Sequence, residues 1–304
     1  MKLQYHQGKN FGDQLNPLIF DYYLPGYFNN QEDLVVMGIG SILGFHDRFP
    51  GKKIVFSSGF DASQPNTYGQ LPTHLDDFDF ICVRGPKTAQ LLGLDSSFAI
   101  TDGAILLKEM VQDRPAKKYP ISLMPHAGSE EFHNHQLLCD ALGWQLISPK
   151  WEVEEVLEKI QQSELLITEA MHGAIVADTL RVPWIPYVGF KTIGTFKWED
   201  WAASMEVPYR PFYLTPFFSK EKIGELINKR LSRFSLQALA PMVEWLLHWR
   251  FRMIWKRNLE ILRNQAHLKN AFMSKDEVLN DRFRRLRAKL EEFKMKYPIE
   301  KFGG

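Results

Sequence analysis

The segment Glu164–Tyr187 holds the residues whose types and spacing best suit a reaction site. Its apolar run, typical of a buried strand, is followed by Glu169, His172 and Gly173 and then by a helix of small residues. A strand-to-helix turn of this kind brings a carboxylate, an imidazole and the positive end of a helix together at the edge of a sheet. This placement favours a functional His172, although a lone histidine in an apolar setting is more often a hydrogen-bonded core residue.

Basic side chains occur at two further turns. Arg84 ends an apolar run in "VRGPKTAQLLG", where it would face the crevice in which α/β proteins bind ligands, and guanidinium pairs well with carboxylate or phosphate. The segment Tyr187–Trp201 adds Lys191 and Lys197 beside two tryptophans, which suits a phosphate and a sugar face. The alternatives are a surface arginine at a domain edge and a surface loop whose tryptophans pack inward.

Two glycine-containing turns precede these segments. In "NFGDQLNP", Gly12 permits a tight turn, and Asp13 or Asn16 can cap the helix that follows, leaving amide groups for an anion or a sugar. A plain helix start is the alternative. In "MGIGS", Gly40 lets the backbone approach a ligand, but residue 43 is Leu. The third glycine of the dinucleotide-binding fingerprint is therefore missing, which disfavours a nicotinamide or flavin enzyme.

His126 follows another strand-like run and precedes His133 and His135. The last two are spaced so that they would not share one face of a helix. A metal cluster of these three histidines is the weaker hypothesis, because their spacing matches no common ligand pattern. We expect no metal site.

Short apolar runs alternate with helical patterns through the first two-thirds of the chain, which predicts an α/β fold with parallel sheets. The charged segment Lys108–Pro120 separates two such halves and has the composition of a linker. We expect an N-terminal Rossmann-like domain over 1–115, a second over 116–215 and a helical basic extension over 216–304. The expected strands are Leu34–Gly40, Lys53–Ser58, Phe78–Gly85, Phe98–Ala104, Pro120–His126, Trp144–Pro149, Glu164–Ala170 and Val182–Tyr187. The expected helices are Lys87–Gly93, His135–Leu142, Val153–Ser163, Gly173–Leu180, Ser219–Leu231 and Leu239–Tyr297.

Composition and charge narrow the class of protein. Hydrophobic residues make up 45% of the 304 residues and charged residues 24%, both ordinary for a globular protein. The two cysteines, Cys82 and Cys139, lie in apolar runs, which suits free thiols in a reducing cytoplasm. The start of the chain has no apolar core of secretory length, so we expect a cytoplasmic protein.

Five motifs together are similar to those of the polysaccharide pyruvyl transferases. Their order and spacing carry the resemblance, which is closest to the branch that acts on exopolysaccharide repeat units, such as the succinoglycan-type pyruvyl (ketal) transferases. The motifs are "NFGDQLNP", "VMGIGS", "VRGPKTAQLLG", "TDGAILL" and "LLITEAMHGAIVADTLRVPWIPY".

The resemblance implies a two-domain, GT-B-like fold with the active site in the cleft. It implies phosphoenolpyruvate as donor, with no other cofactor and no metal, and a sugar diol as acceptor, giving a cyclic pyruvate ketal and inorganic phosphate. Better known members read roughly Ser-x-Arg-Leu-His-Gly in the last motif. His172 matches the histidine, but Ala170 stands at the arginine position, so another cation must bind the donor.

Roles follow from the resemblance as expectations. His172 would be the general acid and base, held by Glu169, with His126 as a second candidate for proton transfer. Arg84 aligns with a family arginine, and Lys197 or Lys191 stands where a later basic residue is expected. The expected donor-binding residues are Arg84, Lys197, Lys191 and Gly173, and the expected acceptor-binding residues are Asp13, Asn16 and Gly40.

The last part of the chain, residues 241–304, carries fifteen Lys or Arg and eight Asp or Glu, a net charge of +7 on a chain whose total is +1. Its stretch "EWLLHWRFRMIWKRNLEILR" is basic and amphipathic, which is typical of helices on anionic membrane surfaces. Such a helix would reach a lipid-linked oligosaccharide acceptor at the inner face of the plasma membrane. Alternatively, it packs across both domains with its basic side in water.

Two other functions stay open at this point. A nucleotide-sugar glycosyltransferase would share the GT-B fold and a basic cleft, and a non-catalytic carbohydrate-binding protein would need neither His172 nor Arg84. We expect no nucleic-acid partner.

Overall fold

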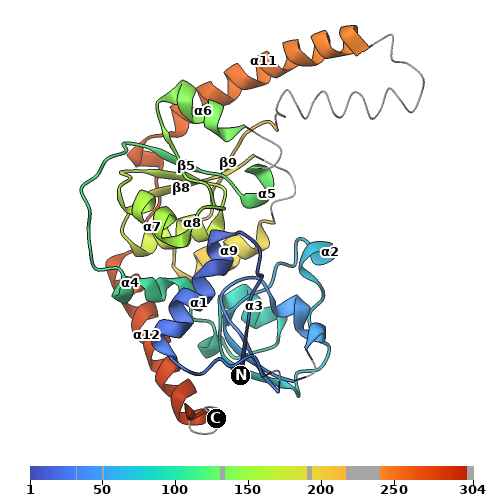
Figure 1. Cartoon of the computed structure of the whole chain (residues 1–304), viewed down its shortest axis with the longest axis vertical. Helices are drawn as coiled ribbons and strands as arrows, with labels where there is room; N and C mark the ends of the chain where they lie inside the picture. Colours follow the sequence, from blue (N-terminus) through green and yellow to red (C-terminus); the bar gives the residue numbers. More distant parts are fainter. Residues whose placement is uncertain (32, 50, 131–133, 190–193, 217–239, 300–304) are drawn as a thin grey trace.

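Two parallel β-sheets form the centre of the molecule (Figure 1). The structure, a computed structural model, describes residues 1–31, 33–49, 51–130, 134–189, 194–216 and 240–299, apart from the side chains of 240–244 and 247–248. The first sheet has the strand order β1-β2-β3-β4 and the second the order β6-β5-β7-β8-β9. The α/β class with parallel sheets is confirmed, whereas the GT-B-like arrangement and the domain boundaries stay predictions.

The first sheet takes its strands from the first 83 residues. Its strands are short and largely buried, as expected of parallel strands covered on both faces. The strands are β1 (Lys2–Gln4), β2 (Leu34–Met37), β3 (Lys52–Ser58) and β4 (Phe78–Val83). The helices and 3₁₀ turns of this half are α1 (Phe11–Tyr23), η1 (Leu43–Arg48), α2 (Pro65–Tyr68), α3 (Pro86–Leu91), η2 (Ser96–Phe98), η3 (Gly103–Leu106) and α4 (Leu107–Met110).

The second sheet follows the linker segment. Its first four strands in the chain alternate with helices, and all of its paired strands are parallel. The strands are β5 (Ser122–Met124), β6 (Gln145–Leu146), β7 (Leu166–Thr168), β8 (Trp184–Val188) and β9 (Phe212–Tyr213). The helices are α5 (Ala127–Glu130), α6 (His135–Leu142), α7 (Val153–Gln161), α8 (Met171–Thr179) and α9 (Phe196–Ser204).

The predicted strand Phe98–Ala104 is wrong. The segment instead forms the 3₁₀ turns η2 and η3, because the side chains of Asp95 and Asp102 accept hydrogen bonds from the amides of Ser97 and Ala104 and cap them. Only one isolated bridge, between Val83 and Ala99, links this segment to β4. The short strands β1 and β9 were not predicted.

The predicted helix Leu239–Tyr297 is two helices, α11 (Ala240–Gln265) and α12 (Asp276–Lys296), with the 3₁₀ turn η5 (Leu268–Asn270) between them. The break occurs because Phe272 exchanges two backbone hydrogen bonds with Trp184 of β8, and Ser274 donates to the buried Asp178. The predicted helix Ser219–Leu231 lies outside the described residues. Among the helices that the structure describes, none is both long and apolar enough to cross a membrane.

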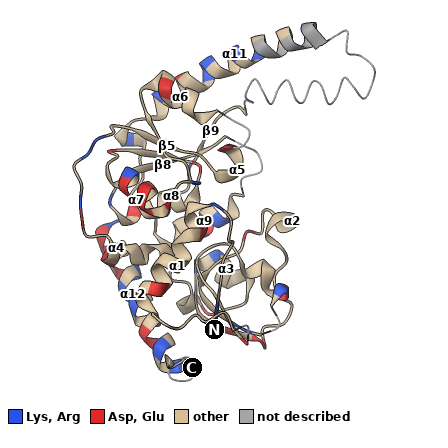
Figure 2. Ribbon diagram, in the orientation of Figure 1, with Lys and Arg blue, Asp and Glu red and all other residues tan. Residues whose placement is uncertain are grey.

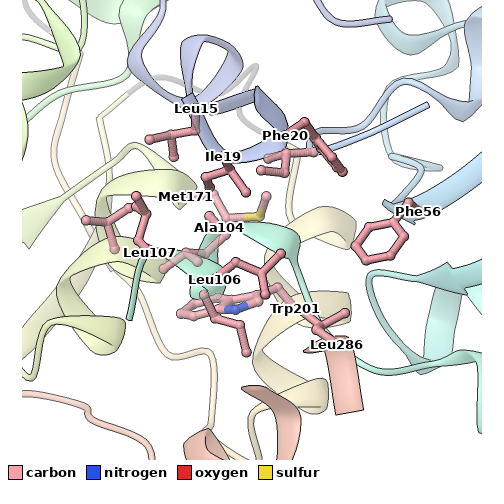
Figure 3. Close-up of a cluster of buried hydrophobic side chains, with 14 of the residues drawn as sticks. Leu15, Ile19, Phe20, Phe56, Ala104, Leu106, Leu107, Met171, Trp201 and Leu286 are labelled. Atoms are coloured by element: carbon pink, nitrogen blue, oxygen red, sulfur yellow. The ribbon is translucent and has the colours of Figure 1, made fainter. Parts of the chain in front are cut away.

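One hydrophobic core joins the two sheets (Figure 3). Leu15 of α1, Met171 of α8 and Trp201 of α9 belong to it, together with Leu106 of η3. Leu286 of α12 completes the same cluster, so this part of the basic tail is a core element that packs beside η3 and β4. The two sheets are therefore held in a fixed relation by shared apolar packing.

A buried ion pair also connects the two halves. Arg84, just after β4, donates from Nε to Asp200 of α9 at 3.1 Å, and both side chains are fully buried. The other two guanidinium nitrogens donate to Ser41 Oγ and to the Phe60 carbonyl, both at 2.7 Å. Asp200 also accepts from the amide and hydroxyl of Thr88 at 3.0 and 2.6 Å. Because every nitrogen of Arg84 is engaged, this guanidinium fastens α9 to the first sheet.

Removing one partner should leave an uncompensated buried charge. We expect Asp200→Ala to lower the free energy of unfolding by about 3–5 kcal/mol, measured by urea denaturation. The matched control is the half-exposed pair of Lys87 on α3 and Glu199 on α9, where Lys87→Ala should cost less than about 1 kcal/mol. Equal effects of the two substitutions would contradict the structural role of Arg84.

Candidate active site

A cavity of about 690 Å³ lies where the two halves meet. The first turns of α1 and α8 both line it, and the end of β5 and the loop after β2 add to its wall. Helix N-termini carry amide groups without intrahelical acceptors and a partial positive charge. The cavity is therefore open to an anionic ligand and draws its wall from both halves of the chain.

His172 lies in the first turn of α8 and faces Asp102, from the first half of the chain. The His172 Nε2 and Asp102 Oδ2 atoms are 3.6 Å apart, and the imidazole is 14% exposed while the carboxylate is buried. This separation is too long for a hydrogen bond, and within the described structure neither atom has a hydrogen-bond partner. Asp102 Oδ1 accepts from the amide of Ala104, which fixes the carboxylate. The buried carboxylate is thus placed to orient the imidazole at the cavity wall.

Gly12 of α1 holds the other side of the imidazole. A Cβ atom at this position would lie 2.0 Å from His172 Nδ1, so no larger residue fits without moving the ring. The first turn of α1 therefore packs directly against His172. The sequence predicts a tight turn at Gly12, whereas its contact with His172 is evident only in the folded chain.

Glu169 does not occupy the place predicted for it beside His172. It is fully buried, and its Oε1 accepts from the Gly189 amide at 2.7 Å while Oε2 accepts from the His126 amide at 3.1 Å. It thus ties the segments after β5 and β8 to the turn after β7. The carboxylate that faces the imidazole is Asp102 of the motif "TDGAILL", for which no role was predicted.

The charge of the cavity is strongly positive. Lys2, Arg48 and Lys197 line it, whereas Asp13 is the only carboxylate among its described lining residues. Lys197 Nζ donates to Tyr68 Oη at 3.0 Å, and the Arg48 guanidinium stacks 4.2 Å from the Phe45 ring centre. Lys197, which was predicted to bind the donor, is one of the residues that line the cavity. Lys2 and Arg48 were not predicted, and Lys191 lies outside the described residues.

His126 lines the same cavity in a neutral state. Burial and the nearby charge of Lys197 lower the pKa of its imidazole to about 3. Its Nδ1 accepts from the Gly128 amide at 3.1 Å, so the neutral ring carries its proton on Nε2. At neutral pH His126 can offer a hydrogen bond but has no imidazolium proton to give.

Asp13 and Gly40 lie together at the cavity wall. Burial raises the pKa of the Asp13 carboxyl, and the charges of His172, His6 and Lys197 oppose this shift. Asn10 Nδ2 donates to Asp13 Oδ2 at 2.7 Å. Gly40 has a φ of +123°, which disfavours a side chain there, and its missing Cβ would be 3.8 Å from Asp13 Oδ1. Asp13 is thus a carboxylate that can take up a proton more readily than an exposed one.

Three residues that were predicted to bind the donor or the acceptor are not among the described residues that line the cavity. Each of them contacts other parts of the protein. Arg84 forms the buried ion pair described above. The side-chain amide of Asn16 fixes the loop after β2, because it accepts from the Ile39 N–H and donates to the Ile39 carbonyl. It also donates to the Asp13 carbonyl, which receives no helical hydrogen bond from Pro17 because proline has no N–H. Gly173 packs against Met124 and Thr168, where a Cβ would lie 2.6 Å from each.

In the described ranges no three His, Cys, Asp or Glu side chains gather as metal ligands would, and His133 lies outside those ranges.

Comparison with known proteins places the chain in a family. Residues 2–188 match the family described as polysaccharide pyruvyl transferase. An alignment of 210 residues with the succinoglycan biosynthesis protein ExoV of Rhizobium meliloti (strain 1021) is 38% identical and covers 67% of this chain. The match spans 64% of that relative's length, slightly less than two thirds. With a match over more than half of its length, this chain belongs to the polysaccharide pyruvyl transferase family.

Proposed function

We propose that this protein transfers the pyruvyl group of phosphoenolpyruvate to two hydroxyls of a sugar in an exopolysaccharide repeat unit, forming a cyclic pyruvate ketal. The observation that carries the proposal is the pair of His172 and Asp102 at the wall of a cavity that three cations and one carboxylate line. The similarity to a succinoglycan biosynthesis protein supports a polysaccharide acceptor.

Donor binding uses the positive charge of the cavity. Phosphoenolpyruvate carries a phosphate and a carboxylate, and both are met by Lys2, Arg48 and Lys197. The first turn of α8 adds amide donors beside Ala170, the position where other family members carry an arginine. Arg48 and Lys2 are the cations that take over the charge of that arginine. His126 contributes a neutral N–H group, which binds an anion without needing to titrate.

The chemistry begins with a proton transfer. Protonated His172 gives its proton to C3 of phosphoenolpyruvate, which turns the methylene into a methyl group and leaves positive charge on C2. Asp102, 3.6 Å from His172 Nε2, orients the ring for this step. The first sugar hydroxyl then attacks C2 and loses its proton. A C–O bond to phosphate breaks, a second hydroxyl attacks and loses its proton, and the products are the ketal and hydrogen phosphate.

Two groups can receive the hydroxyl protons. His172 is a base once it has delivered its proton, and Asp13 is a second one, because burial raises the pKa of its carboxyl. One proton returns to the enzyme for the next turnover and the other leaves on the phosphate. Charge and atoms therefore balance without any cofactor.

A membrane surface is the proposed location of the acceptor. The N-terminal part of α11 projects from the sheets (Figure 1), and Lys and Arg recur along it (Figure 2). Trp245, Leu246, Trp249 and Met253 are 48–66% exposed, whereas Phe251, Ile254 and Trp255 on another side pack towards the second sheet. At 100° per residue, Arg250 and Arg257 flank one side of the exposed stripe and Arg252 flanks the other, while Lys256 falls within the stripe. An apolar stripe bordered by cations suits an anionic lipid interface.

Substitution of the proposed acid should abolish transfer. We expect His172→Gln to lower the rate of acceptor-dependent phosphate release from phosphoenolpyruvate by about 10²–10⁴-fold, and Asp102→Asn to lower it by at least about tenfold while donor affinity stays within a factor of about two. His267→Gln, an exposed histidine of the tail, is the control. Full activity of His172→Gln, or transfer from nucleotide sugars in place of phosphoenolpyruvate, would contradict the assignment.

Asp13→Asn should trade activity for stability. A raised carboxyl pKa means that the folded state holds the proton more tightly than the unfolded state, so stability is lost as pH rises through the folded pKa. Asparagine does not ionise, so the variant does not lose stability in this way. We therefore expect Asp13→Asn to raise the unfolding temperature, with a gain that grows as the pH rises above the ordinary carboxyl value of about 4, while transfer slows. A gain that is independent of pH would show that burial of the charge is not the cause.

Binding to vesicles tests the α11 surface. We expect the protein to sediment with phosphatidylglycerol vesicles and not with phosphatidylcholine vesicles, and the double variant Trp245→Ser/Trp249→Ser to lose binding without loss of soluble-acceptor activity. Leu268→Ser, an exposed apolar residue outside the stripe, is the control. Failure of the wild-type protein to bind at low salt would remove the membrane from the proposal.

A further inference from the structure

A second cavity, of about 600 Å³, lies beside the candidate active site. It runs along the outer side of α1 and reaches the start of α7. Gln7 and Asn10 line both cavities, so the segment of residues 7–10 forms a rim that the two share. A ligand long enough to cross this rim would contact both cavities.

The chemistry of the two cavities differs. The second cavity has two lysines, Lys9 and Lys150, against Asp21, Glu152 and Glu154. Its charge is therefore nearly balanced and slightly negative, in contrast to the cationic active-site cavity. An anionic donor is favoured in the first cavity, whereas the second suits a neutral ligand.

The polar and aromatic groups of the second cavity are those that bind sugars. Trp151 lies just before α7, is half-buried against the main core and is one of the residues that line the cavity. Gln14 of α1 lines the same cavity and donates to the Gly8 carbonyl, which holds its amide in place. A flat aromatic face covers the C–H face of a pyranose ring, while amide and carboxylate groups pair with its hydroxyls.

The length of the cavity indicates more than one sugar ring. Its lining residues on and before α1 extend from Asn10 to Asp21, a distance of about 16 Å at the rise of an α-helix. The end at Asn10 adjoins the active-site cavity and the end at Asp21 is open to solvent. This geometry fits a linear oligosaccharide whose reacting sugar enters the active-site cavity.

We propose that the groove between α1 and the start of α7 is an extended acceptor subsite that binds the neutral sugar residues next to the one that receives the ketal. The inference rests on the proposed function and makes the acceptor an oligosaccharide rather than a single sugar. Trp151 stacks against one sugar ring, and Gln14 and Asp21 bind hydroxyls of the neighbouring sugars. The oligosaccharide crosses the rim of residues 7–10 to reach the active-site cavity.

The test measures binding by isothermal titration, which does not depend on turnover. The probes are size-fractionated, depyruvylated fragments of succinoglycan and a series of cello-oligosaccharides. In at least one series we expect the hexasaccharide to bind about tenfold more tightly than the disaccharide, and Trp151→Ala to remove this difference. Trp151→Tyr, which keeps a ring, should retain most of it. Trp144→Ala, a half-buried tryptophan outside the groove, is the matched control.

Asp21→Arg is a second variant that tests the groove even if Trp151→Ala fails to fold. Asp21 is exposed, so its replacement should be tolerated, and the longer arginine side chain fills the far end of the groove. It should weaken hexasaccharide binding and leave disaccharide and phosphoenolpyruvate binding unchanged. The absence of any length dependence in both series, or a length dependence that survives both substitutions, would overturn the subsite. Failure of pyruvyl transfer with intact length-dependent binding would instead count against the proposed function alone.

Discussion

The contact between His172 and Asp102 is the interaction on which the site depends. The imidazole belongs to the second half of the chain and the carboxylate to the first, so neither half contains the pair by itself. Gly12 on α1 closes the other side of the ring. The distance of 3.6 Å between His172 Nε2 and Asp102 Oδ2 persists only if the two sheets keep their relative position.

The rest of the structure maintains that position. A single core with Leu15, Met171, Trp201 and Leu286 spans both sheets and includes the C-terminal helix α12. The buried ion pair of Arg84 with Asp200 adds a directional link between the first sheet and α9. Because α9 also carries Lys197 at its start, the same link sets the place of a cation in the cavity. Packing, ion pairing and site geometry are thus parts of one arrangement.

Much of this fold was predictable because local sequence patterns agree with the observed helices and strands over most of the first two-thirds of the chain. Apolar runs located the strands from β2 to β8, and α6 begins and ends as expected. The position of His172 at a cavity also followed from a local feature, the turn from β7 into α8. The segment Phe98–Ala104 was misassigned because its apolar residues resemble a strand, whereas the capping aspartates Asp95 and Asp102 decide its structure.

The partners of the site residues were less predictable, because tertiary packing chooses them. Glu169 is close to His172 in sequence, yet its hydrogen bonds run to Gly189 and His126. Arg84 stands at a strand end, as a ligand-binding arginine would, but residues distant in sequence occupy its nitrogens. Lys2 lies on a strand too short to be recognised, and Arg48 on a 3₁₀ turn, so neither signalled a place in the cavity.

The central claim is that His172 delivers a proton to C3 of phosphoenolpyruvate within a site shared by the two halves. The most direct measurement is a reaction in D₂O with an acceptor oligosaccharide, followed by proton and phosphorus NMR. The account predicts a ketal whose methyl group carries one deuterium, with inorganic phosphate formed in equal amount, and neither product with His172→Gln. A methyl group without deuterium, or unchanged ketal formation by His172→Gln, would contradict it.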